Sequence, residues 1–343
     1  MQRRVGAVVA LRLQSGCLYA LDQTALPWHE RELELRCAQD VADATRRLVI
    51  RGAPLIGVAA GYGVALELAR EADAVHEALD RASELLRSAR PTAVNPARAV
   101  DRVRAAVLDA APGEEAGAAL AQARSIHAEE VQASGALGRV GAELLAGCRR
   151  ILTHCNTGAL AAPGTGTALA IVTELAARGE LSVIATESRP LLQGARLTVY
   201  ELAKLDIPHE LVVDAAAPGL IAAGAVDAVI VGCDRVAANG DVANKVGTYG
   251  LALAAGAAGI PFVVAGPTST IDPACAGGAQ IEIEERDPEE VRSVADRPLT
   301  LPGTRCRNPA FDLTPAALVT ALATERGVAT PVNADTVLAL LPA

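Results

Sequence analysis

The sequence is poor in aromatic residues, which make up only 2% of its 343 residues. Hydrophobic residues nevertheless reach 51%. The core must therefore be filled mainly by aliphatic side chains and by close approach of the backbone at small residues. A chain of this length usually exceeds one small core, so we expect two domains.

An excess of basic residues is also absent. The formal net charge is −9, with 31 lysines and arginines against 40 aspartates and glutamates. Proteins that bind nucleic acid normally carry a basic face, so we expect no nucleic-acid partner. Individual basic side chains could still hold one small anion.

The seven cysteines lack the spacing of a disulfide framework or of a structural zinc site. Their number is odd, they are widely separated, and no CxxC pair occurs. We therefore expect reduced thiols in a cytoplasmic protein, without a metal. The N-terminus has no long apolar run followed by a cleavage site, which predicts no signal peptide.

One uncharged stretch, residues 246–271, is long enough to cross a bilayer. Glycines and prolines divide it into a short helix and a strand. A buried α/β segment explains it better, and we expect no membrane span.

The hydrophobic pattern changes near residue 150. The first part is strand-like to about Leu21 and then mostly helical, with helices expected over 33–48, 57–69, 74–89 and 118–145. In the second part, helical segments alternate with short apolar strands, expected at 150–153, 182–185, 210–213, 228–231 and 262–265. Strands that are apolar on both sides are typical of a parallel sheet covered on both faces.

The sequence therefore predicts an α/β fold, in which a doubly wound parallel sheet follows a smaller, mainly helical domain with a short N-terminal β segment. We place the boundary near residue 145, which gives domains of residues 1–145 and 146–343. Doubly wound sheets bind ligands at the carboxyl ends of their strands. The motifs of chemical interest in the second domain all fall at such ends.

Two basic motifs in the first domain are candidates for anion binding. In RGAPLIG, Arg51, Gly52 and Ala53 open a predicted helix, and free N–H groups at a helix N-terminus favour phosphate. An ordinary Gly/Pro turn is the alternative. In RPTAVN, Arg90 ends a helix before a proline, and a solvated arginine is the alternative there.

The loop THCNTG follows the strand expected at 150–153. Cys155 would lie near a helix N-terminus, which lowers the pKa of a thiol and makes it reactive; a buried inert cysteine is the alternative. The glycines of the following GTG lack the third glycine of a dinucleotide fingerprint, so an NAD-dependent oxidoreductase is poorly supported and we expect no cofactor. His154 is a potential metal ligand, but no further cluster accompanies it.

Two further motifs follow strands. Gln193 lies near a helix start, and its amide can both donate to and accept from sugar hydroxyls; an ion pair of Glu187 with a nearby arginine is a structural alternative for this segment. Asp234 follows an apolar strand, where desolvation can raise the pKa of a carboxyl until it works as an acid near neutrality. Asn244 offers a directional amide, and Lys245 a compact charge for phosphate.

Long segments carry a family resemblance: THCNTGALA, ESRPLLQGARLT, DRVAANGDVANKVGTY, AGPTSTID, IEERDPEEV and NPAFDLTPAALVTALATERGV, with RGAPLIG and RPTAVN in the first half. They resemble the methylthioribose-1-phosphate isomerases of methionine salvage, a branch of methionine biosynthesis. The similarity covers nearly the whole chain, in order and at compatible spacing. It implies a helical N-terminal domain, a Rossmann-like C-terminal domain and a homodimer.

The same resemblance implies an aldose-ketose isomerisation, from 5-methylthio-α-D-ribose 1-phosphate to 5-methylthio-D-ribulose 1-phosphate. Asp234 matches the catalytic acid/base of the family and Cys155 its partner in the transition state. The matching substrate-binding positions are Arg51, Gly52, Ala53, Arg90, Gln193, Asn244 and Lys245. Three positions depart from the family pattern, namely Thr165, Ser188 and Cys233.

The wider superfamily supplies two alternatives, a ribose-1,5-bisphosphate isomerase and a non-catalytic regulatory subunit like those of translation initiation factor 2B. A bisphosphate needs a second phosphate pocket, whereas a methylthio group needs an apolar one. A regulatory subunit has no need to keep both Cys155 and Asp234. The sequence leaves open whether the C2 hydrogen moves as a proton, through Cys155, or as a hydride.

Overall fold

The computed structural model describes residues 8–71, 74–90, 93–294 and 297–342. Residues 1–7 of the first predicted segment, two residues of the RPTAVN motif, residues 72–73 and 295–296 and the C-terminal residue lie outside the described residues. The chain begins with a three-stranded antiparallel sheet of β1 (Leu11–Gln14), β2 (Cys17–Leu21) and β3 (Glu32–Leu35). The third strand was not predicted, and it takes Leu33 out of the helix expected at 33–48.

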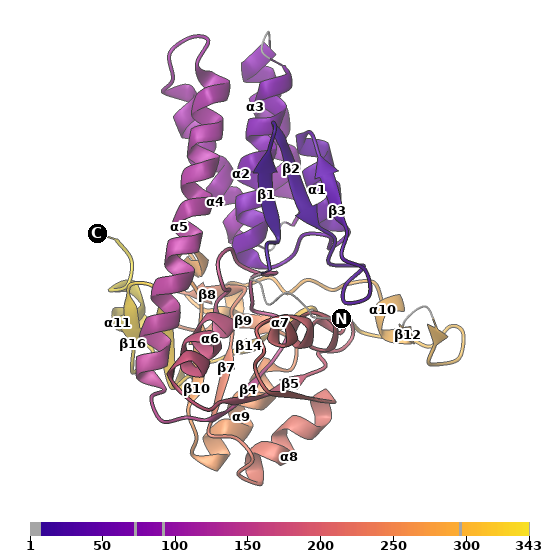
Figure 1. Cartoon of the computed structure of the whole chain (residues 1–343), viewed down its shortest axis with the longest axis vertical. Helices are drawn as coiled ribbons and strands as arrows, with labels where there is room; N and C mark the ends of the chain where they lie inside the picture. Colours follow the sequence, from indigo (N-terminus) through magenta and orange to yellow (C-terminus); the bar gives the residue numbers. More distant parts are fainter. Residues whose placement is uncertain (1–7, 72–73, 91–92, 295–296, 343) are drawn as a thin grey trace.

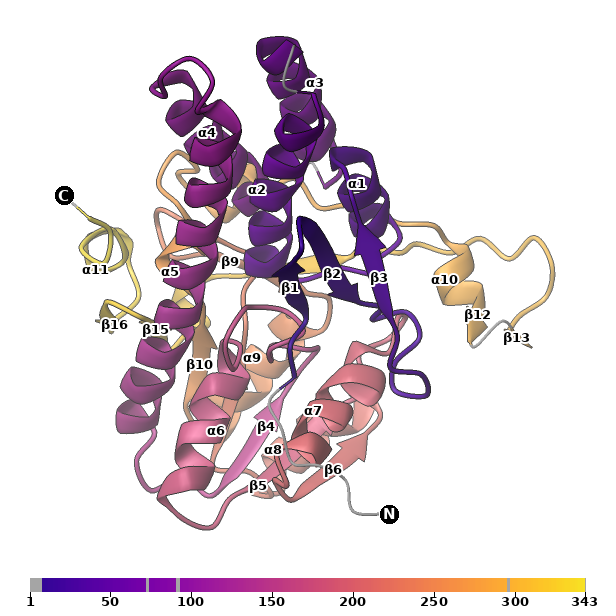
Figure 2. The same ribbon diagram turned by 45° about the horizontal axis from the view of Figure 1, so that its top comes forward.

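A group of helices follows this small sheet: α1 (Ala38–Arg46), α2 (Ala53–Arg70), α3 (Val75–Ser88), α4 (Val94–Leu108) and α5 (Glu115–Leu144). The other three expected helices are thus confirmed as α2, α3 and α5. The central helix is α2, which is buried along nearly its whole length and is surrounded by the other four. Figure 2 shows this helical group above the larger sheet.

The second part of the chain is built on a seven-stranded sheet in the order β16-β15-β10-β7-β4-β5-β6. Its strands are β4 (Arg150–Thr153), β5 (Ser182–Thr186), β6 (His209–Val212), β7 (Ala228–Val231), β10 (Phe262–Ala265), β15 (Ala321–Thr324) and β16 (Gly327–Ala329). All pair in parallel except β16, which is antiparallel to β15. The parallel strands therefore follow the order 3-2-1-4-5-6, which is the doubly wound order.

Helices cover both faces of this sheet (Figure 1). One face packs against α8 (Ala217–Ala222) and α9 (Thr248–Ala258), and the other against α6 (Ala168–Arg178), α7 (Val199–Lys204) and the second half of α5. The five expected strands are confirmed with ends that differ by at most one residue. Only the edge strand β6 departs from the expected double coverage, because its Glu210 and Leu211 are exposed.

A smaller sheet beside the large one was not predicted. It has the order β11-β8-β9-β14, with β11 (Ile271–Asp272), β8 (Arg235–Ala237), β9 (Val242–Lys245) and β14 (Phe311–Thr314). Further along the chain, α10 (Glu289–Arg292), β12 (Ser293–Val294) and β13 (Arg297–Pro298) form an arm that projects from the body, and α11 (Ala334–Leu338) lies near the C-terminus. The small sheet matters for function because β9 ends at Lys245.

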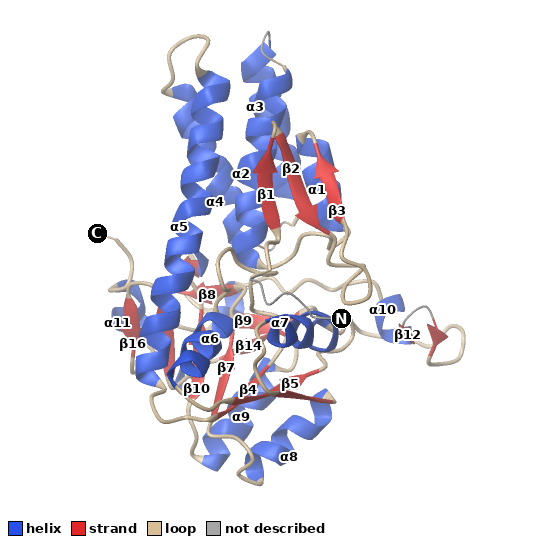
Figure 3. Ribbon diagram, viewed as in Figure 1, coloured by secondary structure: helices blue, strands red, loops and turns tan. Residues whose placement is uncertain are grey.

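The long helix α5 belongs to both halves (Figure 3). Its Ala119 and Ile126 join the core of the N-terminal helices, whereas Leu137 and Ala142 join the core beneath the large sheet. The domain boundary near residue 145 stays a prediction, since the two cores share this element. Within the described ranges, no helix is long and apolar enough to cross a membrane.

Candidate active site

One cavity collects side chains from both halves of the chain. Its walls are Leu48, Arg51, Gly52, Arg90, Cys155, Leu191, Gln193, Asp234, Lys245, Arg286, Ala310 and Phe311. Seven of the nine predicted site residues are among them; Ala53 and Asn244 are not. A larger cavity of about 750 Å³ between α4, α5 and residues 267–273 contains none of the nine.

The cavity opens where the strand order of the large sheet reverses. Cys155 follows β4 and Asp234 follows β7, and these two strands are neighbours, with Thr153 opposite Ile230. Loops that leave adjacent strands in opposite directions create a crevice at such a switch point. The fold thus brings the two residues to one place although they are distant in sequence.

Cys155 is held by its backbone. It is buried and has a φ of 64°, a left-handed conformation that is uncommon for a residue with a side chain. Its N–H donates to Ser188 Oγ at 2.7 Å, and its carbonyl accepts from Thr198 Oγ1 at 2.6 Å. Ser188, one of the departures from the family pattern, still supplies the hydroxyl that this contact needs.

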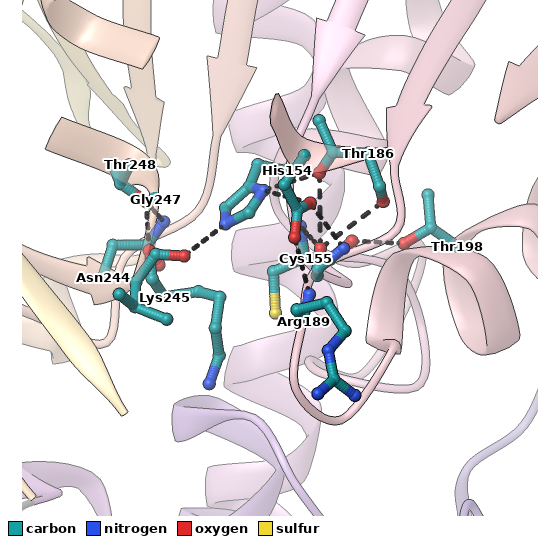
Figure 4. A network of polar contacts seen from close by, with 12 residues as sticks. His154, Cys155, Thr186, Arg189, Thr198, Asn244, Lys245, Gly247 and Thr248 are labelled. Carbon is teal, nitrogen blue, oxygen red and sulfur yellow. Dashed lines mark hydrogen bonds and ion pairs between the residues drawn. The ribbon is translucent and has the colours of Figure 1, made fainter. Parts of the chain in front are cut away.

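His154 connects the β4 loop to the segment that follows β9 (Figure 4). Its Nε2 lies 2.9 Å from the carbonyl oxygen of Val246, and its Nδ1 lies 2.6 Å from Thr186 Oγ1. Since a carbonyl only accepts, Nε2 carries the proton and Nδ1 accepts from the threonine hydroxyl. Burial lowers the pKa of His154, which keeps the ring neutral. In the described parts of the chain, no three His, Cys, Asp or Glu side chains gather as a metal site would require.

Asp234 is partly buried at the cavity wall. Its backbone N–H donates to the carbonyl of Ala243 at 3.0 Å, which ties it to β9. Desolvation raises the pKa of Asp234, and the positive charges of Lys245, Arg51 and Arg90 offset part of that rise. The neutral carboxyl is therefore populated at higher pH than in an ordinary aspartate.

Lys245 is buried, and its side chain extends to the same side as Cys155 Sγ in Figure 4. Its Nζ lies 5.4 Å from the centre of the Phe311 ring, and no carboxylate of the described residues lies within ion-pair distance. Burial lowers the pKa of Lys245, while the nearby Cys155 and Asp234 act in the opposite direction. The charge is therefore available to an anion that enters the cavity.

Asn244 points away from this charge, because successive side chains of a strand face opposite sides. Its Nδ2 donates to Thr248 Oγ1 at 2.9 Å, and that hydroxyl donates to the carbonyl of Lys245 at 2.7 Å. In this arrangement, Asn244 supports the turn after β9 rather than lining the cavity.

The N-terminus of α2 forms another wall. Gly52 has a φ of 93°, and a Cβ there would lie 2.4 Å from the carbonyl oxygen of Ala161. That carbonyl accepts from the N–H of Leu55 at 3.1 Å, and Pro54 has no N–H. Of the first three helical residues, Ala53 is therefore the one with a backbone donor left for an anion.

Arg51 precedes this helix and is bound by one residue. Its Nη1 donates to Asn156 Oδ1 at 2.5 Å, and its Nη2 to the carbonyl of Asn156 at 2.9 Å. Asn156 belongs to the THCNTG loop and was not among the predicted site residues. The contact fixes the direction of the guanidinium at the cavity wall.

Arg90 and Arg286 share one carboxylate. Glu284 accepts from Arg90 Nη2 and from Arg286 Nη1, both at 2.9 Å, and Arg286 also donates to Glu290 at 2.6 Å. The Arg90 side chain is only 16% exposed, and its Nε is buried without a hydrogen-bond partner, so the solvated-arginine alternative is wrong. Arg286 was missed; the IEERDPEEV segment contains it, but nothing local indicates that it faces a cavity.

Gln193 precedes the helical turn of residues 194–198, as predicted from its place near a helix start. It is 5% exposed, and its Oε1 has no hydrogen-bond partner. Burying an amide oxygen without a partner is unfavourable, which points to a ligand as the missing donor. The alternative ion pair of Glu187 is not formed with Arg189 or Arg196, whose guanidinium groups donate to backbone carbonyls.

The other two departures from the family pattern lie outside the cavity wall. Cys233 Sγ lies 3.3 Å from Thr270 Oγ1, and burial raises the pKa of this thiol to about 12. A protonated thiol is a poorer nucleophile than a thiolate, which disfavours oxidation of Cys233. Thr165 packs on α5, where its N–H donates to Ser134 Oγ at 3.0 Å.

Comparisons with known proteins identify the family of the chain. Residues 49–331 match the model of the initiation factor 2 subunit family. The chain is 50% identical to a methylthioribose-1-phosphate isomerase of Albidiferax ferrireducens, over 97% of each chain. It is similar to the crystal structure of 5-methylthioribose 1-phosphate isomerase from Pyrococcus horikoshii, with 37% identity, a TM-score of 0.90 and coverage of 98% of this chain and 96% of that one. A structure described as translation initiation factor eIF-2B, subunit delta, from A. fulgidus is 39% identical, with a TM-score of 0.85 and coverage of 97% and 100%. The chain therefore belongs to the initiation factor 2 subunit family and, within it, to the methylthioribose-1-phosphate isomerases.

Proposed function

We propose that this chain is an aldose-ketose isomerase that converts 5-methylthio-α-D-ribose 1-phosphate to 5-methylthio-D-ribulose 1-phosphate in methionine salvage. The observation that carries the proposal is the cavity in which Cys155 and Asp234 meet several cationic groups. A phosphorylated sugar needs both parts, since cations bind its phosphate and an acid opens its ring.

We assign the phosphate to the end of the cavity formed by α2 and β9. Arg51 and Lys245 line that end, the free N–H of Ala53 follows the wall residue Gly52, and the dipole of α2 adds to the attraction for an anion. Arg90 contributes a further guanidinium, whose free Nε supports this role. Gln193, with its unpartnered oxygen, is assigned to a sugar hydroxyl.

Asp234 is the proposed acid. The phosphate on the anomeric carbon prevents the sugar ring from opening spontaneously to an aldehyde, so the ring oxygen needs a proton before the C1–O bond breaks. The raised pKa of Asp234 supports this role, because a neutral carboxyl has a proton to give. General acid catalysis of this kind contributes about 10²–10⁴-fold.

The hydrogen must then move from C2 to C1. Cys155 takes the C2 proton in one route and passes hydrogen to C1 through an enediolate-like species; in the other, a hydride shifts directly between the carbons. Turnover in heavy water separates them. Deuterium at C1 of the product supports the proton route, and its absence counts against a proton that exchanges with solvent.

The apolar part of the cavity supports a methylthio substituent over a second phosphate. Leu48, Leu191, Ala310 and Phe311 contribute this surface. Among the described residues of the cavity wall, Arg286 is the one additional cation, and two glutamates already occupy N–H groups of its guanidinium. A ribose bisphosphate would therefore find less to bind than a methylthio sugar does.

Assays of the purified chain with defined sugar phosphates test the proposal. We expect turnover of 5-methylthioribose 1-phosphate and much less of ribose 1,5-bisphosphate, with 5-deoxyribose 1-phosphate included as a probe of the methylthio contact. A preference for the bisphosphate would favour that isomerase instead. No turnover of any of the three would support a regulatory subunit.

We further propose a homodimer that works in the cytoplasm. Exposed apolar side chains support an interface between copies of this chain; they include Leu211, Val213, Tyr249 and Leu253. The seven free thiols fit a reducing compartment. Light scattering on the purified chain tests the dimer, and a monomer mass would contradict it.

A further inference from the structure

A buried carboxylate that the proposed reaction does not use lies behind Arg51. Glu201, on α7, is 3% exposed. Its Oε1 accepts from Asn156 Nδ2 at 2.7 Å, and the backbone N–H groups of Ala159 and Leu160 also donate to its carboxylate. Each of these partners is a donor, so they favour the ionised form, although burial raises the pKa of Glu201 to about 7.

Asn156 connects this carboxylate to Arg51. A side-chain amide has one donor end and one acceptor end. The donor end of Asn156 faces Glu201 and Thr198 Oγ1, at 2.7 and 3.3 Å, and the acceptor end faces the guanidinium of Arg51. Glu201 therefore determines which end of the amide Arg51 meets, and a rotated amide would place N–H groups against the cation.

The carboxylate itself has little freedom. A Cβ at Gly158 would lie 2.3 Å from Glu201 Oε2, so the loop after β4 closes directly over it. Loop, carboxylate, amide and guanidinium thus form one continuous set of contacts. An arginine held in its bound direction loses less conformational entropy when its ligand arrives.

We propose that Glu201 is a positioning residue that fixes the guanidinium of Arg51 for the substrate phosphate by acting through Asn156. The proposal rests on the phosphate-binding role assigned above to Arg51. A purely structural carboxylate would affect only the stability of the fold, whereas a positioning role also makes the affinity for phosphate depend on Glu201.

Binding of inorganic phosphate to the full chain, measured by calorimetry at pH 8, tests the link. Glu201→Gln keeps the shape but replaces one acceptor with a donor, and we expect phosphate binding about fivefold weaker. In steady-state assays, KM should rise while kcat changes little, because contacts made equally in the ground and transition states affect only KM. The matched control is Glu130→Gln. Glu130 also has a pKa raised to about 7 by burial, but it bonds Ser269 beside the larger cavity and should leave phosphate binding unchanged.

A double-mutant cycle decides whether the effect passes through Arg51. Arg51→Lys keeps the charge and removes the planar fork, so it should weaken phosphate binding without abolishing it. In the Arg51→Lys background, Glu201→Gln should weaken phosphate binding little further. Equal weakening in both backgrounds, or unchanged binding in the single variant, would overturn the proposal.

Asn156→Ala breaks the link by removing the amide that contacts both Glu201 and Arg51, and it replaces Glu201→Gln in the cycle if that variant does not fold. Phosphate binding is measured without turnover. A chain that lacks isomerase activity but shows the coupling would therefore lose the proposed function and keep this inference, whereas an active isomerase without the coupling would lose only the inference.

Discussion

Cys155 and Asp234 follow two adjacent parallel strands, β4 and β7, and face one cavity at the point where the strand order of the sheet reverses. Their closeness is a property of the doubly wound topology, since the two strands are far apart in the sequence and become neighbours only in the folded sheet. The positive charges around Asp234 come from the segment before α2, the segment after α3 and the end of β9. The candidate site therefore exists only when both halves of the chain are folded.

Asp234→Asn should reduce kcat by at least about 10²-fold, because the amide has no acidic proton for the ring oxygen. Binding of inorganic phosphate, measured by calorimetry, should stay close to that of the wild type. Asp227→Asn is a suitable control, since Asp227 precedes the same strand at its opposite end and pairs with Arg150. A variant at Asp234 with near-normal turnover would remove this residue from the mechanism.

The pH dependence should separate Asp234 from Lys245. Burial raises the pKa of Asp234, and only its neutral form is an acid, so kcat should fall as the pH rises through that pKa. Burial lowers the pKa of Lys245, so its charge is present at low pH and is lost as the pH rises through the lowered value, which should raise KM. Profiles of kcat and KM against pH measure the two effects separately. A kcat that rises from neutral to alkaline pH would contradict the acid role.

The parallel sheet could be predicted because its strands are short apolar runs between helical segments. Ala228–Val231 and Phe262–Ala265 are buried at every position, and both were predicted with their correct ends. The small sheet gave no comparable signal. β8 and β9 have three and four residues, and β14, which completes their pairing, lies far along the chain.

The site could be predicted where a motif follows a strand or opens a helix, as it does at Gly52 and Asp234. Asn156 and Glu201 were missed as functional candidates, since their significance depends on a contact between two separate segments. Arg286 was missed for the same reason, because only the folded chain brings it beside Arg90 through Glu284. No local pattern reports such a contact.

Glu284→Gln should loosen both arginines that it bridges. The amide keeps an acceptor but loses the charge that both guanidinium groups share, so we expect KM to rise roughly threefold or more, with a smaller change in kcat. Glu289→Gln is the control, because Glu289 is exposed and its contact with Arg292 is long, at 3.5 Å. Steady-state kinetics of both variants check this, and equal KM values would show that the bridge does not position either arginine.

Gly52→Ala should destabilise the fold and displace the N-terminus of α2 from the wall of the cavity. The added Cβ would lie 2.4 to 2.7 Å from three atoms of Ala161, in a backbone conformation that already disfavours a side chain. Gly113 separates the close contact of the Cβ from the cost of the backbone conformation. Its φ of 91° nearly equals the 93° of Gly52, but a Cβ there would meet nothing within 4 Å. In urea unfolding, Gly113→Ala should lower the free energy of unfolding by about 1–2 kcal/mol, the cost of the backbone conformation alone. Gly52→Ala should lower it by more than about 3 kcal/mol, because α2 must move away from Ala161. If the two variants lost equal stability, the close approach of α2 to the loop after β4 would not be what requires glycine at position 52.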